Sequence, residues 1–230
     1  ASGEYPENSL LAFEKAIEQG ADAIELDVHF HQPSDNFIVI HDEFVEGTTN
    51  GSSQLNQLSL ATLLQIPLGQ NQHLVTLEQA LAHIRGRVAV NIEIKSKSEK
   101  IIEITHQLQQ LKQVINQSIL EHQFSTEHIV LSSFNHKYIV QSKLILPSVA
   151  TGALIAHLPL DKAKLTEAIG CQYLNIDIDA ISDELVKDAH NRGVKVWVYT
   201  VDRQEDIQLC MKYNVDGFFT NYPGKSLKIF

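Results

Sequence analysis

Apolar positions recur along this chain with two alternating periods. A period of two over short segments indicates strands, and a spacing of three and four residues indicates helices, as in Leu10, Phe13 and Ile17 of the first one. The pattern predicts seven main helices, at residues 9–19, 77–84, 99–120, 137–144, 162–169, 182–191 and 203–213. It predicts strands at residues 23–28, 88–95, 128–134, 150–155, 173–177, 194–200 and 215–220.

Strands that alternate with helices are typical of an α/β protein with a parallel sheet. Seven parallel strands approach the eight of a (β/α)8 TIM barrel. The helix at 9–19 needs a strand before it, so we expect the first barrel strand to lie upstream of residue 1. A doubly wound open sheet is the competing architecture. We see no linker or internal repeat, which predicts a single domain over residues 1–230.

One apolar run does not fit the parallel alternation. Residues 37–41 follow the strand at 23–28 after too few residues for a helical crossover, which needs about a dozen. We therefore expect an antiparallel hairpin arm that turns around residues 32–36. Residues 43–75 are polar and irregular, with one short helix expected near 58–65. Together these segments predict an insertion at about 29–75 after the second barrel strand.

Charged residues lie inside two strands that should be buried. Glu25 and Asp27 alternate with apolar residues in one strand, and Glu93 and Lys95 do so in another. Side chains in a strand alternate between faces, so the acids share one face and point into an enclosed space. A buried unpaired charge costs several kcal/mol. Oxygen ligands facing one another favour a divalent metal, Mg²⁺ or Ca²⁺, over zinc.

Two other interpretations of the acids remain open. They could form an ion-pair network with Lys95, although one cation cannot neutralise three carboxylates. Asp27, His29 and His31 share strand parity and could bind a softer metal. We expect the two histidines beyond the barrel rim and partly solvated.

His41 ends the hairpin arm and is the candidate general acid or base. Antiparallel pairing would bring it opposite Glu25, at the mouth of the acidic cluster. Histidine there can transfer protons near neutral pH.

Composition narrows the range of partners. The chain has 230 residues and a net charge of −10, without a basic stripe, which argues against nucleic acid and anionic membranes. It contains no apolar run of about 18 residues and no signal peptide, so we expect no stable membrane insertion. Cys171 and Cys210 are expected to be reduced thiols. We expect a cytoplasmic protein, although a removed leader would give the same picture.

Motifs along the whole chain resemble the glycerophosphodiester phosphodiesterase family. Each is weak alone, but their order and spacing are specific. In chain order they are Pro6-Glu7-Asn8, Leu11-Ala12-Phe13, Gly20-Ala21-Asp22, Glu25-Leu26-Asp27-Val28, Val39-Ile40-His41-Asp42, Thr48-Thr49-Asn50-Gly51, Asn91-Ile92-Glu93-Ile94-Lys95, Ser132-Ser133-Phe134, residues 197–201, and Thr220-Asn221-Tyr222-Pro223.

The resemblance implies a (β/α)8 barrel that hydrolyses glycerophosphodiesters to glycerol 3-phosphate and an alcohol, a reaction of lipid and glycerol metabolism. It implies Glu25, Asp27 and Glu93 as ligands of Mg²⁺ or Ca²⁺. His41 matches the second of the family's two catalytic histidines, and Lys95 matches its phosphate-contacting lysine.

Further matches and departures complete the resemblance. Phe134 and Trp197 match residues near the glycerol moiety, and Asn221 replaces a usual Asp. The family's His-Arg-Gly motif, with its first catalytic histidine, is expected just before Ala1. Two alternatives differ in function: a related barrel phosphodiesterase acting on lysophospholipids or cyclic phosphates, and a non-catalytic barrel that binds phosphate esters.

Overall fold

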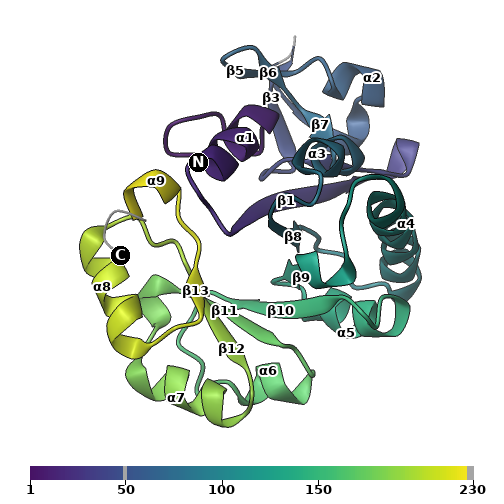
Figure 1. The fold of residues 1–230 in the computed structure, drawn as a ribbon. Coiled ribbons are helices and arrows are strands. Elements are labelled where there is room, and N and C mark those ends of the chain that lie inside the picture. Colours follow the sequence, from purple (N-terminus) through teal and green to yellow (C-terminus); the bar gives the residue numbers. More distant parts are fainter. Residues whose placement is uncertain (49–50, 227–230) are drawn as a thin grey trace.

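A curved sheet of nine strands, with helices along its outer side, forms the body of the protein (Figure 1). The computed structural model describes residues 1–48 and 51–226. Seven strands run parallel in the order β13-β12-β11-β10-β9-β8-β1, and β2 and β7 extend the sheet antiparallel beyond β1. The parallel strands are β1 (Ala23–His31), β8 (Ala89–Ile94), β9 (Ile129–Ser133), β10 (Ala150–Ile155), β11 (Tyr173–Asp177), β12 (Lys195–Tyr199) and β13 (Gly217–Phe218).

Helices connect the successive parallel strands, which confirms the predicted α/β alternation. This is the arrangement of a (β/α)8 barrel, in which the carboxyl ends of the strands carry the functional residues. The helices are α1 (Leu10–Glu18), α2 (Leu60–Leu63), α3 (Leu77–Ile84), α4 (Ile101–Glu121), α5 (His136–Ile145), α6 (Lys164–Ala168), α7 (Asp183–Asn191), α8 (Gln204–Tyr213) and α9 (Pro223–Ser226).

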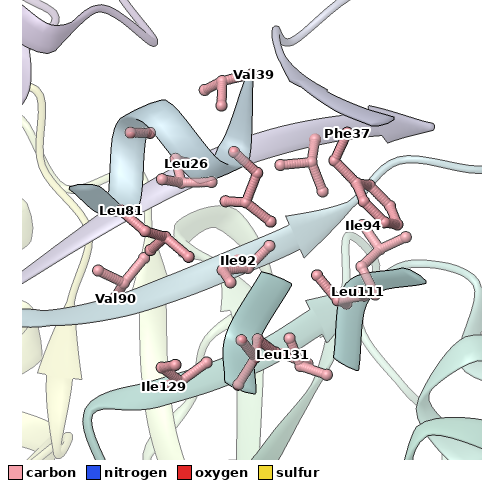
Figure 2. Packing of buried hydrophobic residues seen from close by; sticks show 14 of the residues in the cluster. Leu26, Phe37, Val39, Leu81, Val90, Ile92, Ile94, Leu111, Ile129 and Leu131 are labelled. Carbon is pink, nitrogen blue, oxygen red and sulfur yellow. The ribbon is translucent and has the colours of Figure 1, made fainter. Parts of the chain in front are cut away.

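The largest apolar cluster lies between the sheet and the helices that cover it (Figure 2). Leu26, Ile92 and Leu131 come from three adjacent strands and are fully buried against Leu81 of α3 and Leu111 of α4. Truncating one such side chain to alanine typically costs about 2–5 kcal/mol. Burial of this outer face fixes the strand parity and directs the alternate, polar residues into the barrel interior.

Helix α1 precedes β1 as predicted, and the residues at its two ends explain where it begins and stops. The Ser9 hydroxyl accepts a hydrogen bond from the backbone N–H of Ala12 at 3.1 Å, which caps the first turn. The helix ends at Glu18, and Gly20 then adopts a φ of +88°, a conformation that favours glycine.

The predicted hairpin arm is confirmed as β2 (Asn36–Val39), but its register differs from the expectation. Val28 lies opposite Val39, so the pairing extrapolates to Leu26 opposite His41. The prediction that His41 faces Glu25 across the pair was wrong by one residue. Backbone hydrogen bonding to β1 continues to Ile40, whose N–H donates to the carbonyl of Asp27 at 3.0 Å, and His41 follows directly.

The segment between β2 and β7 (Val75–Thr76) has more regular structure than its polar composition predicted. It contains two small antiparallel sheets, formed by β3 (Phe44–Thr48) with β4 (Gly51–Gln54) and β5 (Pro67–Gly69) with β6 (Gln72–His73). The short helix is confirmed, as the four residues of α2. Thr49 and Asn50 of the Thr-Thr-Asn-Gly motif lie outside the described residues. The single domain with an insertion at about 29–75 stays a prediction.

Three further expectations can be compared with the structure. Helix α4 is continuous over 21 residues and corresponds to the helix predicted at 99–120. Cys171 and Cys210 are free, buried thiols, as predicted. Among the described residues, no helix combines the length and apolar character that crossing a bilayer requires.

Candidate active site

Three carboxylates meet at the carboxyl ends of two adjacent parallel strands. Asp27 of β1 lies opposite Glu93 of β8, and Glu25 lies opposite Asn91 one step earlier. One carboxylate oxygen from each acid lies within 4.8 Å of the other two. The alternation of side chains along each strand predicted this convergence, because it puts all three acids on the face opposite the apolar core.

Lys95 follows directly after β8 and is the cation in contact with this cluster. Its Nζ lies 2.7 Å from Glu93 Oε1 and 3.1 Å from Asp27 Oδ1. Burial opposes the charged ammonium, but the two carboxylates outweigh burial and raise the pKa of Lys95. The lysine therefore carries a positive charge at neutral pH.

The carboxylate charge of the cluster exceeds what the lysine compensates. Glu25 Oε1 is buried, and no hydrogen-bond partner for it exists among residues 1–48 and 51–226. Burial, followed by repulsion from Asp27 and Glu93, raises the pKa of Glu25 well above its usual range. Burial also raises the pKa of Glu93. An unpartnered oxygen beside two further carboxylates fits a divalent cation that prefers oxygen ligands.

Asn8 braces the second acid from the loop before α1. Its Nδ2 donates to Asp27 Oδ2 at 2.9 Å, and its Oδ1 accepts from the backbone N–H of Asp27 at 3.1 Å. Its φ of +54° lies in the left-handed region, which asparagine tolerates better than most residues. Asn8 thus ties the loop before α1 to the strand that carries Asp27.

His41 lines the same cleft, half-exposed, just beyond the end of β2. Its Nδ1 lies 2.8 Å from Asp42 Oδ1, and its backbone carbonyl accepts from His29 Nε2 at 2.9 Å. A carboxylate on Nδ1 fixes the orientation of the ring. His41 is therefore a candidate for proton transfer beside the acids.

The two histidines of β1 are not arranged as ligands of a softer metal. His31 is fully buried, with Nδ1 2.6 Å from the Ser34 hydroxyl and Nε2 3.0 Å from the carbonyl of Leu58. Both ring nitrogens are thereby engaged. The expectation of a partly solvated His31 beyond the rim was wrong, because residues from the insertion cover it. Burial lowers the pKa of His29, which favours its neutral form.

Aromatic side chains also line the cleft. The rings of Trp197 and Tyr173 lie 4.1 Å apart between centroids, and Phe219 packs edge-on to Trp197 at 5.7 Å. Phe134 is 48% exposed and meets the ring of Tyr199 at 6.1 Å. The packed rings hold Trp197 in place, whereas Phe134 offers a free face to the cleft.

The residues to which the sequence assigned a catalytic, metal-binding or substrate-binding role line one cleft of about 1040 Å³. The structure therefore brings together side chains from the ends of five different segments of the chain. These residues are Glu25, Asp27, His41, Glu93, Lys95, Phe134 and Trp197.

A polar layer in the barrel interior was not predicted. Asn91 Nδ2 donates to the Ser132 hydroxyl at 3.0 Å. Asn175 is fully buried, and within the described part of the chain neither atom of its amide has a hydrogen-bond partner. Gly152 makes room for this amide, since a Cβ there would lie 3.0 Å from Asn175 Nδ2. Strand parity could have indicated Asn91 and Asn175, because each lies between two apolar residues, but Ser132 and Gly152 have Ser133 and Thr151 as neighbours.

Asp202 lies one residue before Arg203, the N-cap residue of α8, and that helix has no side-chain cap. Asp202 instead accepts from the backbone and side-chain amides of Asn221, at 2.8 and 2.6 Å, and from the Thr220 hydroxyl at 3.1 Å. Asn221 thus fixes the loop after β13 at the edge of the cleft.

The fold and the site are those of a (β/α)8-barrel enzyme, with clustered acids and a lysine at the carboxyl ends of its strands. The family model of the glycerophosphoryl diester phosphodiesterase family matches residues 1–225. The chain belongs to this family and is a phosphodiesterase of this class. The family is generally dependent on a divalent metal, and the acidic cluster could hold one.

Curated relatives agree with this assignment. The chain is 32% identical over 237 residues to a glycerophosphodiester phosphodiesterase of Caldanaerobacter subterraneus, covering 96% of this chain and 91% of the relative. It is 27% identical over 242 residues to a glycerophosphodiester phosphodiesterase of Bacillus altitudinis, covering 99% and 94%.

Solved structures support the fold. One is a phosphodiesterase of Oleispira antarctica in complex with the product sn-glycerol-3-phosphate, with a TM-score of 0.87, 24% identity, and coverage of 99% of this chain and 92% of that one. Another is a glycerophosphodiester phosphodiesterase of Parabacteroides distasonis, with a TM-score of 0.83, 23% identity, and coverage of 97% and 90%.

Proposed function

We propose that the protein hydrolyses glycerophosphodiesters to glycerol 3-phosphate and an alcohol, with Mg²⁺ or Ca²⁺ held by Glu25, Asp27 and Glu93. One observation carries the proposal: three carboxylates converge within 4.8 Å beside Lys95, and Glu25 Oε1 is buried without a partner. When bound, such a cation supplies a Lewis acid for a phosphoryl oxygen. Family membership favours hydrolysis over the alternative of a barrel that only binds phosphate esters.

Lys95 supplies positive charge to the reacting phosphate. Its ammonium is anchored by Asp27 and Glu93, and 19% of its side chain is exposed, so it reaches the cleft without needing to reorganise. A fixed cation close to the phosphoryl oxygens stabilises negative charge that develops there during the reaction. Lys95 is therefore the phosphate-binding residue of the proposal.

His41 is the proposed general acid. Hydrolysis breaks the bond between phosphorus and the alcohol oxygen, and that oxygen needs a proton as it leaves. The His41 side chain lines the cleft, and Asp42 Oδ1 orients its ring through Nδ1. A histidine in this position can supply that proton. The rings of Phe134 and Trp197 offer apolar surface to the carbon skeleton of the glycerol moiety.

Turnover of sn-glycero-3-phosphocholine by a His41→Gln variant tests the assignment. General acid catalysis typically contributes ~10²–10⁴-fold, so kcat should fall by about that factor while the far-UV circular dichroism stays the same. His106→Gln is the matched control, because His106 lies on the outside of α4 and pairs with Asp35. Wild-type turnover in the His41 variant would exclude its role.

A further inference from the structure

A second hollow of about 470 Å³ lies beside the active-site cleft. Its walls come from the loop after β8, with Ser96, Lys97 and Glu99, and from residues 134–137 at the start of α5. Phe134 borders both the cleft and the hollow. The two spaces are therefore neighbours at the carboxyl ends of β8 and β9, with one aromatic ring between them.

Hydrogen bonds between the two walls build the hollow in advance of any ligand. Asn135 Nδ2 donates to the backbone carbonyls of Ser96, at 3.3 Å, and Ser98, at 2.8 Å. The hydroxyl of the buried Tyr138 donates to the Ser96 hydroxyl at 2.9 Å. A binding site that is already formed loses little conformational entropy when it is occupied.

One wall of the hollow contacts the segment that carries the proposed proton donor. Lys97 Nζ is 3.8 Å from a carboxylate oxygen of Glu43, which follows His41 by two residues. Lys97 also follows Lys95 by two residues along the chain. The group that receives a proton from His41 is the departing alcohol, so the alcohol is the part of the substrate closest to this hollow.

The residues that line the hollow include two lysines, Lys97 and Lys137, and one acid, Glu99, so they carry one net positive charge, whereas the chain has a net charge of −10. Both ion pairs are long, 3.8 Å for Lys97 to Glu43 and 3.6 Å for Lys137 to Glu99, and the lysine side chains are 94% and 50% exposed. Exposed pairs of this kind are weak, so a bound anion can replace them.

We propose that this hollow is the subsite for the alcohol moiety of the substrate and that it favours an alcohol carrying an anionic group, such as a carboxylate. The inference rests on the proposed function and names its preferred class of substrate. A choline or ethanolamine group places only a cation between the two lysines, whereas a serine group adds a carboxylate that can pair with them.

Two substrates that differ by a single carboxylate test the inference: sn-glycero-3-phosphoserine and sn-glycero-3-phosphoethanolamine. The wild-type protein should have the higher kcat/KM for the serine ester. In a Lys97→Gln/Lys137→Gln variant, the ratio of the two kcat/KM values should fall about threefold to tenfold, as expected for the loss of two exposed ion pairs. Raising the salt concentration should reduce the wild-type ratio in the same direction.

Lys112→Gln, on the exposed side of α4, is the control that removes a lysine elsewhere. A ratio of two substrates cancels any loss of folded protein, so it reports on the subsite alone. If the double variant hydrolyses both esters with the wild-type ratio, the subsite is refuted while the proposed function stands. If the wild-type protein hydrolyses no glycerophosphodiester, the proposed function fails and this inference fails with it.

Discussion

Replacing Glu25 by glutamine should change the stability of the protein in opposite directions with and without a divalent cation. The substitution keeps the size of the side chain and removes one of three carboxylates that converge within 4.8 Å. Glu25 is the informative position, because its Oε1 is buried and has no hydrogen-bond partner in the described residues, whereas Asp27 and Glu93 both contact Lys95.

Without a cation, the variant should be more stable than the wild-type protein. Two like charges 4–5 Å apart repel by about 1 kcal/mol in water and by about 4 kcal/mol near a protein surface. Lys95 offsets part of the repulsion on Glu25. A net gain on the order of 2 kcal/mol raises the melting temperature of a chain of this length by about 4–8 °C.

The pH dependence has a defined sign. The raised pKa of Glu25 means that the folded protein binds its proton more tightly than the unfolded chain does. This tighter proton binding stabilises the folded state. The stabilisation is present in full below the unfolded pKa of about 4.3 and is lost as pH rises through the folded pKa. The glutamine variant lacks this component, so its advantage over the cation-free wild-type protein should disappear in acid.

With a cation, the order should reverse. A ligand at one hundred times its Kd stabilises the folded state by about 2.7 kcal/mol, or about 5–10 °C for a chain of this length. The variant has lost one of the three carboxylates, so it should gain much less.

Differential scanning fluorimetry after EDTA treatment, with and without MgCl₂ or CaCl₂, measures both effects. Glu121→Gln, on the exposed end of α4, controls for the loss of one negative charge. A variant that is destabilised without cations, or one that gains as much from them as the wild-type protein, would refute the reasoning.

The remaining predictions concern stability elsewhere in the fold. Gly152→Ala places a Cβ 3.0 Å from Asn175 Nδ2 and should lower the free energy of unfolding in urea by about 1–3 kcal/mol; an unchanged midpoint would contradict the close packing. Two hydrogen bonds from Arg87 lower the pKa of Glu14 to about 2, so this pair stabilises the protein above pH ~4.3 and loses its effect as pH falls towards 2. Arg87→Gln should therefore cost about 1 kcal/mol or less at pH 7, since the pair is partly exposed, and nothing near pH 2; a pH-independent difference in urea unfolding would argue against this ion pair.

The repeated elements could be predicted from the sequence because they depend on local periodicity. Alternation in residues 23–28 and 88–95 gave both the strands and the face on which Glu25, Asp27 and Glu93 lie. The structure confirms this parity, since β1 and β8 pair in parallel with Asp27 opposite Glu93. One buried face leaves a strand little freedom in register, so a local pattern was sufficient.

Features that depend on contacts between distant segments could not be predicted in this way. His31 is buried because the carbonyl of Leu58, 27 residues later, accepts from its ring. The exact pairing of β2 depends on the turn before it, and an error of one residue placed His41 opposite the wrong neighbour. Asp202 pairs with Asn221, which lies 19 residues away, instead of capping the helix beside it.

The polar layer inside the barrel also depends on contacts between distant segments of the chain. Asn175 and Gly152 come from adjacent strands, and each residue alone reads as an ordinary polar or small position. Only the structure shows that Gly152, which has no side chain, leaves room for the amide of Asn175. Such pairs require knowledge of which strands are neighbours and at what register.

The central claim is that Glu25, Asp27 and Glu93 hold a divalent cation that acts with Lys95 on a phosphodiester. The most direct measurement is the release of glycerol 3-phosphate from sn-glycero-3-phosphocholine by protein stripped with EDTA, before and after Mg²⁺ or Ca²⁺ is added back. We expect release to stop on stripping and to recover with one of the two cations. Undiminished release from the stripped protein would contradict the claim.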